Sequence, residues 1–358
     1  MPRLKILVIN PGSTSTKFAI YHGKESFFTQ TIRHTDEELI NFPFIADQLD
    51  YRLELLFNVL KTQSIELSIL DGIVGRGGFL RPLESGTYLV DEEMLNDLKT
   101  ARFGEHASNL GALMAYKLGS EHNLPSFIVD PIVVDEFEEV SRISGIPGIE
   151  RISNLHALNI KAVSRKVASK LGGTLETYNF VIAHLGGGIS VAAQKKGRLI
   201  DVNNADNEGP FSPERAGGLP AKQLVKLCYS GKYTEKEMLN LLTRQGGLYA
   251  YLGTKNALDA ENRALAGEEK ACLVIDAMIQ QIAKEIGAMA AVLDGEIDGI
   301  ILTGGICYSD FLVRKLSKKI SFLGEIFLVP GEEELEALAE GALRVLNRIE
   351  EAKKYHCD

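Results

Sequence analysis

The first 33 residues alternate short apolar segments with polar turns. Leu4–Ile9 is rich in β-branched and other apolar residues, which predicts a central strand, and Pro11–Gly12 ends it. Lys17–Tyr21 and Ser26–Ile32 repeat the pattern and predict two more strands. An antiparallel meander of this kind differs from the strand-helix-strand opening of dinucleotide-binding domains.

Beyond residue 34, helical and strand patterns alternate. Thr35–Glu38 is a capping box ahead of a helical region that runs to Leu60, and Pro43 interrupts its early part. A loop rich in Gly, Pro and Asn spans Asn203–Pro220. We expect further helices at 91–101, 108–122, 154–171, within 221–293, between the last two strands, and at 332–351, and further strands at 69–74, 127–129, 180–184, 189–193, 199–202, 299–303 and 325–329. The pattern predicts a mixed α/β chain.

Two segments half a chain apart share one layout: an apolar strand, a polar residue, a glycine-containing turn and a second apolar strand. An offset of 174 residues (184 minus 10) aligns three pairs, which are Asn10 with His184, Gly12 with Gly186, and Thr16 with Ser190. Because this offset is close to half of 358 residues, the spacing indicates a duplicated domain. Two unrelated glycine-turn hairpins are the alternative.

The composition narrows the class of partner. A length of 358 residues predicts about two domains. With 39 Lys and Arg against 48 Asp and Glu, the formal charge is -9, so no overall basic field attracts nucleic acid or an anionic membrane. No signal peptide is evident at the N-terminus, and the longest uncharged stretch, Thr177–Gln194, contains three glycines and is unlike a membrane-spanning helix. We therefore expect a cytoplasmic protein with no nucleic-acid or membrane partner.

Both repeated turns have the composition of a phosphate-binding loop, in which backbone N–H groups, hydroxyls and a cation meet phosphate oxygens. The candidate ligands are Gly12, Ser13, Thr14 and Lys17 in the first turn and Gly186, Gly187 and Gly188 in the second. His184 adds an imidazole beside the second turn. Plain hairpin turns and a buried core histidine are the alternatives. The chain contains no Walker motif, dinucleotide fingerprint, zinc-peptidase motif or serine-hydrolase elbow.

Together these motifs resemble the acetate and butyrate kinases, a family in the superfamily of acetate and sugar kinases, heat-shock chaperones and actin. Asn10-Pro-Gly-Ser-Thr-Ser-Thr-Lys17 is similar to the first motif of the family, and His184-Leu-Gly-Gly-Gly-Ile-Ser190 is similar to its second. Gly304 and Gly305, in Thr-Gly-Gly-Ile, resemble the adenosine loop of the superfamily. Three features resemble those of the butyrate kinase branch of the family, namely the first motif, the stretch Gly104–Ala112 and the modest chain length.

The resemblance implies roles for single residues. Arg76 is similar to the substrate-binding arginine of the family and Arg215 to its second active-site arginine, and planar guanidinium groups suit carboxylate and phosphoryl oxygens. Without the resemblance, either could be an ordinary surface arginine. Asp130 is similar to an active-site aspartate near Mg²⁺, which it would reach through water. The implied catalytic set is Asn10, Arg76, Asp130, His184 and Arg215.

Two further assignments are less specific. His156 is similar to another active-site histidine, although its Leu-His-Ala-Leu-Asn surroundings depart from those in acetate kinases, and a histidine on a helix face is the alternative. The run after Pro330 is similar to a region that supplies a magnesium-linked glutamate. We assign this role to Glu334, with Glu332 and Glu333 as alternatives, and acidic residues in the first turn of a helix are favoured in any case by its dipole.

For the fold, the resemblance implies two duplicated actin-like (ribonuclease H-like) α/β domains with a nucleotide cleft between them. The acid-substrate lobe is expected at residues 1–155 plus the C-terminal helix at 331–358, and the nucleotide lobe at 156–330. For the function, it implies reversible phosphoryl transfer from ATP with Mg²⁺ to a short-chain carboxylate, butyrate or a branched relative, in a homodimer or larger homo-oligomer. An acetate or propionate kinase, a sugar kinase with Asp130 as general base, and an acceptor-free ATPase are the alternatives.

Overall fold

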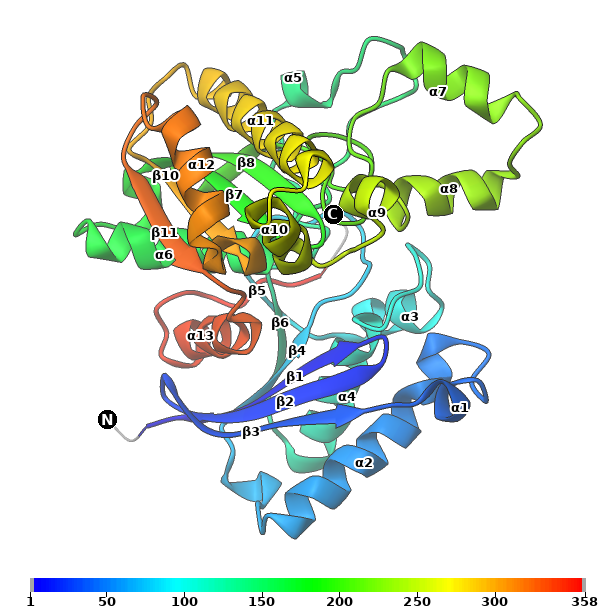
Figure 1. The fold of residues 1–358 in the computed structure, drawn as a ribbon. Coiled ribbons are helices and arrows are strands. Elements are labelled where there is room, and N and C mark those ends of the chain that lie inside the picture. Colours follow the sequence, from blue (N-terminus) through cyan, green and yellow to red (C-terminus); the bar gives the residue numbers. More distant parts are fainter. Residues whose placement is uncertain (1–2, 356–358) are drawn as a thin grey trace. The chain divides into compact units, whose positions relative to one another are not determined.

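The computed structural model describes residues 3–355, which fold into two compact α/β units (Figure 1). The first unit consists of residues 3–134 and 333–355, and the second of residues 135–332. The boundaries expected from the sequence lie near 155 and 330. In the structure, segment 135–155 packs within the second unit, because the buried carboxylate of Glu136 accepts hydrogen bonds from Lys161 and from the backbone N–H of Leu199.

The sheet of the first unit has six strands in the order β3-β2-β1-β4-β6-β5. Their bounds are β1 Lys5–Gly12, β2 Ser15–His22, β3 Glu25–Arg33, β4 Gly72–Arg76, β5 Thr87–Leu89 and β6 Ser126–Val129. The first three form the predicted antiparallel meander, and β4 and β6 add parallel strands beside β1. Strand β5 was not predicted, because its three residues are too few for a recognisable pattern. It pairs antiparallel with β6 at the edge of the sheet.

Helices cover both faces of this sheet, and their bounds are α1 Asp36–Leu39, α2 Leu49–Thr62, α3 Glu92–Lys99, α4 Asn109–His122 and α13 Glu334–Leu346. Side chains on β6 alternate between the two faces: Ile128 packs with α2, α3 and α4, while Val129 faces α13. Pro43 lies in the break between α1 and α2, as predicted. The prediction that the last helix continues to 351 was wrong, because Arg348 takes a positive φ of 60° just after the helix ends.

The sheet of the second unit has five strands in the order β11-β10-β7-β8-β9, with bounds β7 Asn179–Leu185, β8 Ile189–Lys195, β9 Arg198–Val202, β10 Gly299–Gly304 and β11 Ile326–Pro330. The helices are α5 Glu139–Arg142, α6 Ala157–Lys170, α7 Ala221–Cys228, α8 Glu235–Thr243, α9 Gly247–Leu252, α10 Ala257–Leu265, α11 Glu269–Val292 and α12 Asp310–Ile320. Apolar positions every three or four residues along α11 bury one face of this helix in the core. The predicted strands of this unit are all present, within two residues at each end.

The two sheets repeat one arrangement. In each, three antiparallel strands come first in the chain, and the next strand of the sheet runs parallel to the first of the three. Asn10 and His184 both lie near the end of the first strand, but Asn10 faces Lys17 across its hairpin while His184 faces Ser190. The alignment of Thr16 with Ser190 is therefore off by one position, because six residues separate Asn10 from its partner Lys17, whereas five separate His184 from Ser190.

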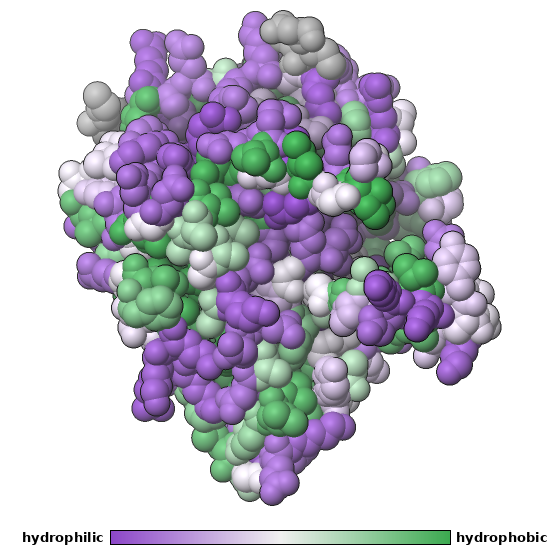
Figure 2. All heavy atoms as spheres, turned by 90° about the horizontal axis from the view of Figure 1, so that it is seen from above, coloured by the Kyte–Doolittle hydropathy of each residue, from purple (hydrophilic) through white to green (hydrophobic). Residues whose placement is uncertain are grey.

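Hydrophilic side chains cover most of the face seen from above in Figure 2, with hydrophobic side chains in smaller groups between them. No helix within residues 3–355 is long and apolar enough to cross a membrane.

Candidate active site

The turn between β1 and β2 presents backbone N–H groups to solvent. Ser13 and Thr14 form this two-residue turn, and both are exposed. Within the described part of the chain, neither of their backbone N–H groups has a protein acceptor. Lys17 is exposed directly opposite Asn10 on the neighbouring strand, so the two side chains lie on one face of the sheet. Free N–H groups, hydroxyls and a nearby cation suit a phosphate.

A buried hydrogen bond lies behind this turn. The hydroxyl of Thr16 is 2.9 Å from Nε2 of His34, and both residues are buried. Burial, together with the positive charge of Arg52, lowers the pKa of His34 to about 4. His34 is therefore neutral at pH 7, and its Nε2 shares a hydrogen bond with the hydroxyl of Thr16.

The lowered pKa of His34 predicts a loss of stability on acidification. In the unfolded chain this histidine titrates near pH 6.5, so on acidification the unfolded chain is protonated before the folded one. The free energy of unfolding therefore falls progressively between pH 6.5 and pH 4. Between pH 7 and pH 5 we expect this residue to lower the free energy of unfolding by about 2 kcal/mol. Urea unfolding at several pH values should give a flatter profile for His34→Gln, with the exposed His122→Gln as control. Equal slopes for His34→Gln and the wild type would contradict this assignment.

Arg76, Asn10 and Glu334 meet where β4 and β1 end and α13 begins. Nη1 of Arg76 lies 2.7 Å from Oε1 of Glu334 and 3.4 Å from Oδ1 of Asn10. The amide of Asn10 donates to Oε2 of Glu334 at 2.7 Å. Asn10 is buried, while the two charged side chains are about a quarter exposed, at 26% and 22%, and so can reach a ligand. The structure thus brings together three of the residues predicted for the active site.

Asp130 follows β6 directly and is 1% exposed. Its Oδ1 accepts hydrogen bonds from the hydroxyl of Ser85 at 2.6 Å and from the backbone N–H of Gly86 at 2.8 Å. The residue takes a positive φ of 39°, which is uncommon outside glycine. Because Val129 pairs with Arg76 across the sheet, this fixed carboxylate lies one residue beyond the position opposite Arg76.

His106 is a candidate that the sequence did not single out. Its ring packs edge-on against Phe79, with ring centres 6.0 Å apart, and its Nδ1 lies 2.8 Å from the hydroxyl of Ser108. Partial burial and the positive charge of Arg76 lower the pKa of His106, which places the ring within electrostatic reach of that arginine. His106 lies in the stretch 104–112, which resembles the butyrate kinase branch of the family. The resemblance was noted for the stretch and not for this histidine.

His184, in the second unit, lies near the end of β7 and is 1% exposed. The amide of Asn159 donates to its Nδ1 at 2.8 Å and also to Thr303 at 3.1 Å, so with the amide in this orientation the ring carries its proton on Nε2. Nε2 lies 3.1 Å from Oε1 of Glu332 without the alignment of a hydrogen bond. The polar Asn159 on the buried face of α6 was missed, because the sequence alone does not distinguish a buried asparagine in a helix from an exposed one.

His156, whose role the sequence left open, stacks on His184. The ring centres are 3.9 Å apart and the rings are 10° from parallel. Nδ1 of His156 lies 3.0 Å from the hydroxyl of Ser190, the residue opposite His184 in the β7–β8 hairpin. The structure therefore places both histidines and the second turn in one cluster.

The glycine turn 186–188 leaves room for two functional side chains. A Cβ atom at Gly188 would lie 2.4 Å from Nη1 of Arg215, and one at Gly186 would lie 3.1 Å from Nε2 of His184. Ser212 links the turn to the arginine, because its hydroxyl donates to the carbonyl of Gly187 at 2.5 Å and accepts from the backbone N–H of Arg215 at 3.2 Å. Ser212 was not predicted, since nothing local distinguishes it from other loop serines.

Arg215 has a donor available for a ligand. Its Nη1 lies 3.1 Å from Asp206, and its Nε is buried with no hydrogen-bond acceptor among residues 3–355. An unpaired buried donor costs about 1–3 kcal/mol. An anion bound at the glycine turn would supply the missing acceptor.

The predicted adenosine loop begins where β10 ends. Gly304 has a φ of 94°, and a Cβ atom there would lie 2.4 Å from the carbonyl oxygen of Leu185, so only glycine fits. Its backbone exchanges hydrogen bonds with Gly331 at 3.2 and 3.0 Å. Apart from Gly305, its two chain neighbours and the adjacent helix backbone, no heavy atom of residues 3–355 lies within 4 Å of the Cβ position of Gly305, which leaves open space for a ligand.

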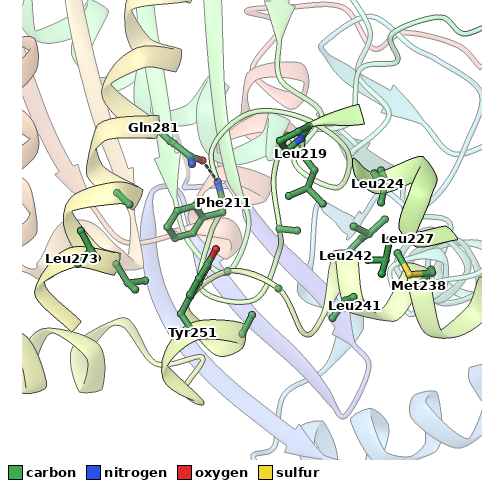
Figure 3. A pocket seen from close by; sticks show the side chains of 18 of the residues that line it. Phe211, Leu219, Leu224, Leu227, Met238, Leu241, Leu242, Tyr251, Leu273 and Gln281 are labelled. Atoms are coloured by element: carbon green, nitrogen blue, oxygen red, sulfur yellow. Dashed lines mark hydrogen bonds between the residues drawn. The ribbon is translucent and has the colours of Figure 1, made fainter. Parts of the chain in front are cut away.

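A separate apolar pocket of about 630 Å³ lies in the second unit among α7, α8, α9 and α11 (Figure 3). Leucine side chains and Met238 line it, and the backbone N–H of Phe211 donates to Gln281 at its edge. Lys270 is the one cation among its lining residues, and none of the predicted site residues takes part. This lining does not suit a polyphosphate, so the candidate active site lies elsewhere.

Each unit thus carries a turn at the end of the first strand of its sheet and an arginine that a ligand can reach. In the first unit the turn has backbone N–H groups without a protein acceptor among the described residues, and in the second unit the turn consists of glycines. Two α/β units with such turns suit a protein of the class that binds and transfers phosphoryl groups. The chain matches the model of the Acetokinase family over residues 147–337. It is 51% identical to a probable butyrate kinase of Listeria innocua, over 98% of this chain and 99% of that protein. The chain belongs to the acetokinase family.

Solved structures show the same fold. An acetate kinase from Porphyromonas gingivalis has a TM-score of 0.78 at 19% identity, over 96% of this chain and 100% of that one. A propionate kinase from Francisella tularensis has a TM-score of 0.75 at 20% identity, over 94% and 98% of the two chains. The predicted actin-like α/β fold, the family, and the enzyme class, a phosphotransferase with a carboxyl acceptor, are confirmed.

Proposed function

We propose that this protein is a butyrate kinase, which transfers the γ-phosphoryl group of ATP reversibly to butyrate or a branched short-chain acid. The observation that carries the proposal is the 51% identity to the probable butyrate kinase of Listeria innocua, which extends over almost the whole of both chains. The polar clusters around Arg76 and His184 supply groups that this chemistry requires.

The reaction places an unusual demand on the site. A carboxylate is already anionic at neutral pH, so the attacking oxygen needs no general base. The difficulty is charge, because two negative reactants must meet in line and the transition state spreads charge over three equatorial phosphoryl oxygens. The site must therefore supply positive charge and hydrogen-bond donors at fixed positions.

The candidate residues fit this demand. Arg76 would bind the acid carboxylate and the phosphoryl oxygens, with Asn10 holding its neighbour Glu334 in place. In the second unit, Arg215 offers its unpaired Nε, and Nε2–H of His184 is a buried donor. Lys17 and the Ser13–Thr14 turn would bind phosphate, and Gly304 and Gly305 would border the adenosine.

Mg²⁺ is the proposed cofactor. It usually binds through one or two carboxylates, waters and substrate phosphates rather than in an all-protein cage. The donor set fits this mode: the described residues contain no cluster of three or more His, Cys, Asp or Glu side chains, while Asp130 and Glu334 are fixed carboxylates at strand and helix ends. When bound, the ion would neutralise charge on the phosphates, with Asp130 acting through water.

We also propose a homodimer or larger homo-oligomer. Four large apolar side chains on or directly after α7, α8 and α9 are more than half exposed, namely Val225, Tyr229, Leu239 and Tyr251. Exposed apolar side chains that form a contiguous patch mark interaction surfaces. Light scattering coupled to gel filtration should give at least twice the mass of one chain, and a monomer at assay concentrations would contradict the proposal.

The function is tested by an acyl-hydroxamate assay with MgATP on acetate, propionate, butyrate, isobutyrate and valerate, with a sugar as control and ADP release followed in parallel. Hydroxamate that matches ADP, strongest for the four- and five-carbon acids, would support the proposal. A preference for acetate or propionate would reassign the substrate within the family. These acids differ from butyrate only by methylene groups, each worth about 0.8 kcal/mol on burial. ADP without hydroxamate on any acid would refute the proposal and leave a sugar kinase or an acceptor-free ATPase.

A further inference from the structure

Arg52 lies directly beneath the β1–β2 turn, and the sequence did not indicate a role for it. Its side chain, on α2, is fully buried at 0% exposure. Nη1 donates to the carbonyl oxygens of Gly12 at 2.9 Å and Ser15 at 3.1 Å, and Nη2 donates to that of Ser13 at 3.1 Å. One guanidinium group thus binds three of the four carbonyl groups of the turn 12–15.

The fourth carbonyl group, that of Thr14, accepts a hydrogen bond from the backbone N–H of His34 at 2.9 Å. All four carbonyl oxygens of residues 12–15 therefore accept hydrogen bonds from groups of the protein that lie behind the turn. Within each planar trans peptide, C=O and N–H point in opposite directions, so fixing the carbonyls of Gly12 and Ser13 fixes the N–H groups of Ser13 and Thr14 outward. These are the two N–H groups that have no protein acceptor within residues 3–355.

The charge of Arg52 has no acidic partner nearby among residues 3–355. Its remaining acceptors are neutral: Oε1 of Gln48 at 3.0 and 2.7 Å, and the hydroxyl of Thr16 at 3.0 Å. Within the part of the chain that the structure describes, no carboxylate lies at ion-pair distance from it. A buried cation without an anion is unfavourable, and a bound anion at the turn would compensate it.

We propose that Arg52 is a positioning residue for nucleotide phosphate. It holds the turn so that the N–H groups of Ser13 and Thr14 face the phosphate, and it adds positive charge behind them. Arg52 acts through the backbone of the turn and does not itself touch the ligand. The inference rests on the proposed function, because it takes this turn to be one that binds ATP.

Two substitutions separate geometry from charge. Arg52→Gln removes the charge and most of the donors, and Arg52→Lys keeps the charge but loses the planar fork. We expect the KM for ATP to rise at least about tenfold in Arg52→Gln and about threefold or more in Arg52→Lys, while the KM for butyrate stays within about twofold. The matched control is Leu56→Ala, because Leu56 is a fully buried residue of the same helix that packs in a hydrophobic core cluster to which no residue of the turn 12–15 belongs. Its KM for ATP should stay at the wild-type value.

A binding measurement supplies a readout independent of turnover. Saturating ADP should raise the melting temperature of the wild type and of Leu56→Ala by the same amount, and that of both Arg52 variants by less. The inference would be overturned if folded Arg52 variants had the wild-type KM for ATP and the wild-type rise in melting temperature with ADP. It would also be overturned if Leu56→Ala changed both quantities as much as the Arg52 variants do. If Arg52→Gln does not fold, Arg52→Lys carries the same comparison. A wild type that makes no acyl phosphate would refute the proposed function, whereas the ADP shifts would still test Arg52.

Discussion

Replacing Arg76 with alanine should lower kcat by about 10³- to 10⁵-fold, the range found for positioned arginines in phosphoryl transfer. Its guanidinium is held by Glu334 at 2.7 Å and lies beside the buried Asn10, so it is oriented before substrate arrives. Orientation in advance means that little reorganisation is needed as charge develops on the phosphoryl oxygens. Steady-state kinetics with ATP and butyrate measure the effect.

The fold should survive this substitution, because a partly exposed Arg–Glu pair contributes only about 0–1 kcal/mol to stability. Arg102→Ala is the matched control, since Arg102 is a surface arginine of the same unit that pairs with Asp97. Circular dichroism and melting temperatures should be similar for the two variants and the wild type. A kcat for Arg76→Ala within about tenfold of the wild type would remove this residue from the catalytic set.

The features that could be predicted from sequence are local ones. The β1–β2 and β7–β8 hairpins are evident because each consists of two apolar strands joined by a turn with glycine or hydroxyl residues. Those turns also contain most of the candidate phosphate ligands, so motif and fold were predicted together. The position of Pro43 likewise marked the break between α1 and α2.

The features that were missed depend on contacts between distant parts of the chain. Arg52 sits on an ordinary amphipathic helix, and only the tertiary fold brings its guanidinium under a turn 40 residues earlier in the sequence. Asn159 orients His184, which lies 25 residues further along, and Ser212 bonds to the turn at Gly187. Polar residues of these types are common on surfaces, so their identity alone could not distinguish them.

Replacing Gly188 with alanine should reduce activity by displacing Arg215. The backbone of Gly188 does not have a positive φ, so alanine can adopt it, but the new Cβ would lie 2.4 Å from Nη1 and 2.9 Å from Cζ of the arginine. A flexible side chain can move away, and the fold is therefore retained. Because a misplacement of about 1 Å can cost about 10²-fold in rate, we expect kcat to fall by at least that factor.

The double variant Gly188→Ala/Arg215→Ala shows whether the effect of Gly188→Ala passes through the arginine. If it does, the double variant should be no slower than Arg215→Ala alone, since the added methyl group then has no guanidinium to displace. Gly287→Ala, in α11, is the matched control. Apart from its chain neighbours and the adjacent helix backbone, no heavy atom of the described chain lies within 4 Å of its Cβ position, and activity should be unchanged. Fully additive losses in kcat would show instead that Gly188→Ala acts on the turn itself, and the contact between Gly188 and Arg215 would then have no part in catalysis.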